Sequence, residues 1–147
     1  MFFAYFVVTD FDDPPRFAED WDHEAKPGGY LWCAHLVELM RSCGATITEQ
    51  QGNHEDYAWR FMASLSGFRY EFIAGDGWES ENWFTHTLIV TPVGTGWLGK
   101  FYTGKQYFHD ARSQFDKIIR QDSCVRKLQT CTQREWMSDL YPSDPEG

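Results

Sequence analysis

The sequence predicts an α+β domain, with a mainly antiparallel sheet of about five or six strands packed against two helices. Three observations lead to this prediction. Several short runs alternate between apolar and polar residues, as half-buried strands do. Two longer segments repeat apolar residues at spacings of three and four, which is typical of amphipathic helices. Aromatic residues make up 18% of the chain, and they favour strands and bury large areas.

Length and charge limit the classes of protein to which the chain could belong. At 147 residues, we expect one domain that spans residues 1–147. The net charge of −9 is uneven, because residues 1–99 carry 15 acidic and 5 basic side chains while residues 100–147 carry 7 and 8. An acidic surface repels phosphates and anionic lipid, so neither nucleic acid nor membrane is expected as a partner. The charge suits a basic partner, or it only keeps the protein soluble.

The first strand is predicted in the apolar, aromatic run of residues 2–9. Acids follow this run at once, and it has neither a basic n-region nor a cleavage site, so we do not interpret it as a signal peptide. No apolar run is long enough to cross a bilayer, and a cytoplasmic location is expected. Residues 10–27 are acidic, contain Pro14-Pro15 and are predicted as a loop.

Helices are predicted over residues 29–43 and 105–121. The apolar positions of the first recur at helical spacing: Trp32, Leu36, Leu39, Met40 and Cys43. Gly44 is a natural end for this helix. His35 lies near its apolar stripe, where a buried or boundary histidine is expected rather than a ligand. The second helix has an expected buried stripe of Phe108, Ala111, Phe115, Ile118 and Ile119.

The centre of the chain predicts a β-hairpin, in which strands at residues 59–65 and 68–72 flank Ser66-Gly67. A short strand is predicted before it at residues 45–49. The polar residues 50–55 are predicted as a turn.

Further strands are predicted after the hairpin. Residues 83–91 alternate clearly and are followed by Pro92, and another strand is predicted at residues 97–102. Residues 123–136 are compatible with a helix or a strand. A short strand after a turn at Asp122-Ser123 is favoured.

The chain has four cysteines: Cys33, Cys43, Cys124 and Cys131. No two of them form a C-x-x-C motif, and no histidine lies at zinc-ligand spacing from them. Cys33 and Cys43 are too far apart on one helix to form a disulfide. A pairing such as Cys43 with Cys124 stays open, while free thiols are the simpler interpretation. No metal and no other cofactor is predicted.

No motif in the chain carries a specific catalytic signature. Residues 94–100 match a glycine-rich nucleotide loop, but Pro92 intervenes and no helix follows, so a turn is expected. The pairs Glu55-Asp56 and Glu79/Glu81 could act as acid and base only if one carboxyl were buried. We therefore expect no catalytic residue and no enzyme. Two alternatives stay open: a small hydrolase that uses Glu55, Asp56 or His54, and a ligand-binding module with an aromatic-lined pocket.

The predicted binding surface consists of acidic loops with one aromatic anchor. Acidic side chains steer a basic protein towards the surface, and a desolvated aromatic residue adds affinity. The predicted partner-binding residues are Asp10, Asp12, Asp13, Glu19, Asp20, Asp22, Glu55, Asp56, Asp76, Trp78, Glu79 and Glu81.

One stretch of the chain resembles a known family. The order of elements resembles that of small bacterial immunity proteins of type VI secretion and polymorphic toxin systems. The resemblance rests on a helix that ends at Gly44, a short strand, Glu55-Asp56-Tyr57-Ala58-Trp59 at the start of the hairpin, a second helix and the late Trp136. The resemblance covers about residues 29–136, whereas residues 2–27 have no counterpart. It implies a non-enzymatic inhibitor that binds a cognate toxin, one with a basic surface, and occludes its active site. Whether the protein also forms a homodimer stays open.

Overall fold

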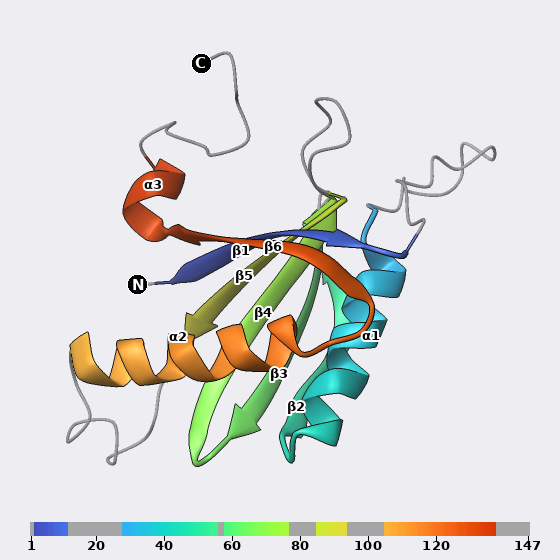
Figure 1. The fold of residues 1–147 in the computed structure, drawn as a ribbon. Coiled ribbons are helices and arrows are strands. Elements are labelled where there is room, and N and C mark those ends of the chain that lie inside the picture. Colours follow the sequence, from blue (N-terminus) through green and yellow to red (C-terminus); the bar gives the residue numbers. More distant parts are fainter. Residues whose placement is uncertain (1, 12–27, 56–57, 77–84, 94–104, 138–147) are drawn as a thin grey trace.

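The computed structural model describes residues 2–11, 28–55, 58–76, 85–93 and 105–137, which form a six-stranded antiparallel sheet with helices packed on it (Figure 1). The strands are β1 (Phe3–Thr9), β2 (Thr46–His54), β3 (Ala58–Leu65), β4 (Phe68–Asp76), β5 (His86–Pro92) and β6 (Val125–Thr132). The helices are α1 (Tyr30–Ser42), α2 (Lys105–Arg120) and α3 (Gln133–Met137). The predicted α+β class, with a sheet of about six antiparallel strands, is confirmed.

The first strand of the chain lies inside the sheet. The strand order is β2-β3-β4-β5-β1-β6, so β1 pairs with β5 on one side and with β6 on the other. Residues 3–7 are at most 1% exposed, because Phe3, Tyr5 and Val7 belong to the main core while Ala4 and Phe6 are buried on the opposite face. Burial on both faces explains why this strand is a continuous apolar run instead of an alternating one.

The predicted hairpin of β3 and β4 is present and forms the centre of the core. Its turn residues Ser66 and Gly67 have φ of 54° and 81°, and positive values at both positions characterise a type I′ turn. Phe61 and Phe72 stand opposite each other with their rings stacked 4.5 Å apart. Helix α2 crosses this side of the sheet and contributes Phe115, which meets the ring of Phe72 edge-on (Figure 1). Strand β4 of the hairpin therefore contributes to the surface on which α2 packs.

The prediction of a turn at residues 50–55 is wrong, because β2 continues to His54. This strand lies at the edge of the sheet, and Gly52, Asn53 and His54 pair with the first three residues of β3. The register shifts between Ile47 and Gly52, and most of the strand is exposed or half-buried. Polar side chains suit an exposed edge strand. Because they replace apolar residues on both faces, the sequence of this strand shows no apolar alternation.

The ambiguous residues 123–136 form a strand followed by one short helix. Strand β6 runs beside β1, which confirms the favoured interpretation, but it is eight residues long. Helix α3 was not predicted, although it begins with a capping box. The backbone N–H of Glu135 donates to Thr132 Oγ1 at 3.1 Å, and the backbone N–H of Thr132 donates in return to Glu135 Oε1 at 3.4 Å.

Some predictions concern residues that lie outside the described ranges. These include most of the acidic loop of residues 10–27, the strand at residues 97–102 and the glycine-rich motif at residues 94–100. Within the described ranges, no helix combines the length and the apolar character that a membrane span requires.

Tyr5 connects β1 to α2, and its contribution to stability is expected to depend on pH. Its hydroxyl donates to Asp116 Oδ1 at 2.5 Å. Burial, and then this hydrogen bond, raise the pKa of Tyr5 well above its ordinary value of 10. The unfolded chain loses the phenolic proton above about pH 10 while the folded protein keeps it, so the stabilisation is complete below that pH and declines above it.

Replacing Tyr5 by phenylalanine should lower the free energy of unfolding at pH 7 by about 1–3 kcal/mol, because the half-buried Asp116 carboxylate loses its donor. Urea unfolding of the wild type and of Tyr5→Phe, from pH 7 to pH 11, measures this difference. The difference should shrink as the pH rises above about 10. A difference that stays constant across that range would contradict the assignment.

Candidate functional site

Where the structure describes the predicted partner-binding residues, they lie at one end of the sheet. Strands β1, β2 and β4 run in the same direction, because an antiparallel strand separates each from the next. Asp10 follows β1, Glu55 follows β2, and Asp76 is the last residue of β4. The register aligns these ends, since Asp76 and Val7 both pair with His86. We call Asp10, Glu55 and Asp76 the acidic end of the sheet.

The surroundings of Asp10 and Glu55 differ. Asp10 is exposed and forms an ion pair with Arg126 of β6, so its charge is already partly compensated. Glu55 is exposed and has a φ of 53°, in the left-handed region of backbone conformation. The other predicted residues lie outside the described ranges: Asp12, Asp13, Glu19, Asp20, Asp22, Asp56, Trp78, Glu79 and Glu81.

The structure describes some of the residues on which the two alternative functions depend, whereas Asp56 lies outside the described ranges. His54 is half-buried at the end of β2, and its neighbour Glu55 is exposed, whereas a carboxyl acid that works near neutral pH is normally buried. The aromatic side chains that would line a ligand pocket are in the interior instead. Phe61, Tyr70 and Phe72 are at most 2% exposed and belong to the same core cluster as residues of α1 and α2.

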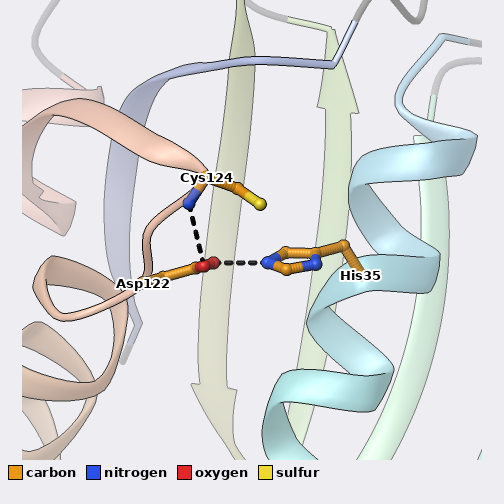
Figure 2. Close-up of side chains that lie close together, drawn as sticks. All are labelled: His35, Asp122 and Cys124. Carbon is orange, nitrogen blue, oxygen red and sulfur yellow. Dashed lines mark hydrogen bonds and ion pairs between the residues drawn. The ribbon is translucent and has the colours of Figure 1, made fainter.

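A second site joins three side chains from distant parts of the chain (Figure 2). His35 lies on α1, while Asp122 and Cys124 lie in the connection between α2 and β6. His35 Nε2 donates a hydrogen bond of 2.5 Å to Asp122 Oδ2. A nitrogen of His35, a carboxylate oxygen of Asp122 and the sulfur of Cys124 all lie within 4.8 Å of one another. We call these three residues the His-Asp-Cys cluster.

The connection after α2 is a tight turn that is organised by Asp122. Its N–H donates to the carbonyl of Ile119 at 3.1 Å, which continues the end of the helix. Its Oδ1 accepts from the backbone N–H of Cys124 at 3.1 Å, an Asx-type bond that commonly forms turns. The backbone N–H of Asp10 donates to the carbonyl of Cys124 at 3.2 Å and ties the turn to β1. The sequence thus places an aspartate and a cysteine together on one ordered turn.

Aromatic rings hold the histidine of the cluster. The indole of Trp32 stacks on His35 with the ring centres 6.2 Å apart, and Phe11 lies 5.1 Å from the same imidazole. Trp32 also stacks on the buried His86, whose Nδ1 is 2.9 Å from the hydroxyl oxygen of Thr9. The side chains of His35 and Asp122 are 24% and 5% exposed, so the cluster lies at the boundary between core and solvent.

The predicted boundary position of His35 is confirmed, whether it binds a ligand is not tested, and its two neighbours Asp122 and Cys124 were not predicted. The imidazole of His35 is partly exposed and is hydrogen-bonded to Asp122. Its partner Asp122 is 87 residues away in sequence, and motif spacing does not reveal such a pair. The one local signal is an aspartate and a cysteine two positions apart after a helix.

The cysteines agree with the simpler of the two predictions, since all four are free thiols. Cys33 and Cys131 are buried, whereas Cys43 is exposed. Burial, and then the charge of Glu135, raise the pKa of Cys131 to about 11, so this thiol stays protonated at neutral pH.

The chain was compared with models of protein families, with curated proteins and with solved structures. None of these comparisons found a match. The chain's own residues and geometry are therefore the basis for a proposed function.

Proposed function

We propose that the protein is a non-enzymatic inhibitor of the immunity type, which binds a basic toxin through the acidic end of its sheet and covers the toxin's active site. The observation that carries this proposal is the common direction of β1, β2 and β4, with Asp10, Glu55 and Asp76 at their ends. These carboxylates come from separate parts of the sequence, and the sheet brings their backbone positions to one side of the molecule.

A rigid base supports this kind of binding. Strands β1 and β4 lie inside the sheet and carry fully buried side chains, including Tyr5 and Phe72. Little backbone freedom is then lost when a partner binds at their ends, so more of the interaction energy contributes to affinity.

Charge supports the proposal in a second way. The chain carries a net charge of −9, which favours encounter with a cationic protein over other partners. Glu55 is expected to contribute most among the three residues, because it is exposed while Asp10 already pairs with Arg126. Association driven by these charges should slow as salt rises, because ions screen charges that lie at the surface.

Co-expression with the product of the neighbouring gene tests the proposal directly. The wild type should form a stable complex with that product and relieve its toxicity. The double variant Glu55→Lys/Asp76→Lys should weaken the complex by about tenfold or more, because two favourable charge contacts become repulsive. Affinity is measured by titration calorimetry at two salt concentrations.

A matched control separates a local contact from net charge. Glu38 is an exposed acid of α1 that pairs with Arg41, and Glu38→Lys changes the net charge by the same amount as one of the two test substitutions. This variant should bind almost as tightly as the wild type. Absence of a complex together with absence of rescue would overturn the proposal. The two substitutions are also made singly. If Glu55→Lys, Asp76→Lys and the control Glu38→Lys each lost the same affinity, the assignment of the binding surface to the acidic end would be overturned.

A further inference from the structure

We propose that the His-Asp-Cys cluster binds one divalent transition metal ion of the zinc class. The three side chains offer an imidazole nitrogen, a carboxylate oxygen and a sulfur within 4.8 Å of one another. Zinc uses these three ligand types in proteins, with bonds of about 2.0–2.3 Å. This proposal is independent of the toxin-binding function, because it concerns different residues.

The separations of the ligand atoms are close to those that one ion requires. Two ligands of a tetrahedral zinc ion lie about 3–4 Å apart, as follows from the bond lengths. The sulfur of Cys124 already lies within 4.8 Å of the other two ligand atoms. His35 Nε2 and Asp122 Oδ2 are closer, at 2.5 Å, since they share a hydrogen bond. Metal entry would replace that hydrogen bond and increase the distance between the two atoms by about 1 Å.

The ligand types also select among metals. A sulfur ligand is soft and favours zinc and related transition metals. Calcium and magnesium prefer sites built from oxygen atoms, and magnesium in addition requires octahedral geometry. With one oxygen, one nitrogen and one sulfur, the cluster suits zinc or cobalt and does not suit calcium or magnesium.

The ligands are held in place before any ion arrives. Asp122 and Cys124 are fixed by the backbone bonds of their turn, which Asp10 ties to β1. His35 is enclosed by the rings of Trp32 and Phe11. Figure 2 shows the sulfur of Cys124 near the hydrogen bond between the imidazole of His35 and the carboxylate of Asp122. Such preorganisation lowers the entropy that binding costs.

Three protein ligands leave a fourth position of a tetrahedral ion for water. His35 is 24% exposed and Cys124 is half-buried, so the cluster is partly accessible to solvent. An open position of this kind is the pattern of reactive zinc sites, whereas purely structural sites are closed by four protein ligands. A bound ion would also connect α1 to the turn between α2 and β6, and should therefore raise the melting temperature of the folded chain.

The test uses the purified full chain after treatment with a chelator and removal of the chelator. Titration with Co²⁺ should produce the sulfur-to-metal charge-transfer absorption that reports a thiolate ligand, and Zn²⁺ should abolish it at one equivalent. Calorimetry with Zn²⁺ should give a stoichiometry of one, and the melting temperature should increase with Zn²⁺ concentration.

Two conservative variants and one control assign the site. Cys124→Ser removes the sulfur, while Asp122→Asn retains an oxygen acceptor for the turn and removes the charge. Each should weaken Zn²⁺ binding by about 100-fold or more, because even residues behind the ligands account for 10–100-fold. Cys43→Ser removes an exposed thiol of the same chain and should leave binding unchanged.

Circular dichroism and urea unfolding without metal establish that each variant is folded. If Cys124→Ser is unstable, Asp122→Asn and the cobalt absorption of the wild type still decide the question. Absence of the absorption in the wild type would overturn the proposal. Zinc binding that survives Cys124→Ser and Asp122→Asn, or that Cys43→Ser abolishes, would also overturn it.

Discussion

Replacing Phe115 by alanine should lower the free energy of unfolding by about 3–5 kcal/mol. Phe115 is fully buried and lies on the inner face of α2. Its ring meets Tyr70 edge-on at 4.8 Å and Phe72 at 5.5 Å, and it lies 5.9 Å from Phe3. Alanine would leave a cavity among aromatic rings that belong to the sheet and cannot move in to fill it.

Urea unfolding monitored by circular dichroism measures this loss, with Gln114→Ala as the matched control. Gln114 is the preceding residue of α2 and is exposed, so its replacement by a good helix former should change stability by less than about 0.5 kcal/mol. A loss below about 1 kcal/mol for Phe115→Ala would show that α2 does not pack on the hairpin as described.

Replacing Gly29 by alanine should lower the free energy of unfolding by about 2–5 kcal/mol. Gly29 precedes α1 with a φ of 91°, and its carbonyl accepts the N–H of Cys33 at 2.8 Å. A side chain in this left-handed conformation costs about 1–2 kcal/mol. A Cβ at Gly29 would also lie 3.0 Å from two backbone atoms of Gly75 in β4, and moving packed backbone costs about 1–3 kcal/mol more.

Gly44 is an internal control for the conformational part of this cost. It also has a φ of 91°, but a Cβ there would meet nothing within 4 Å. Gly44→Ala should therefore cost only about 1–2 kcal/mol. Thermal or urea unfolding of the two variants compares them directly. If both substitutions cost the same, then α1 does not approach β4 at Gly29 as closely as the structure has it.

Much of the fold could be predicted because helices and buried strands leave a local pattern in the sequence. The stripe that contains Ala111, Phe115 and Ile119 repeats at helical spacing, and all three residues are buried. The same reasoning correctly identified α1, the hairpin and β5, although strand ends differed by a few residues. In each of these elements, the spacing of apolar residues within about a dozen positions indicates which face is buried.

The errors occur where that local pattern is weak. β2 is an edge strand whose stability comes from backbone pairing with β3, so polar residues such as Gln51 and Asn53 give no alternation. α3 is only five residues long, and its sequence signal is an N-terminal capping motif rather than an apolar stripe. Neither element can be recognised by hydrophobic periodicity.

Local periodicity was therefore enough to predict the α+β class, the main elements and their buried faces. The tertiary structure alone decided that β1 lies between β5 and β6, that three acidic strand ends share one side, and that His35 meets Asp122. The physical reason is the range of the interactions involved. The spacing of apolar residues reflects contacts within one helix or strand, whereas strand order and the His-Asp-Cys cluster depend on which distant surfaces pack together.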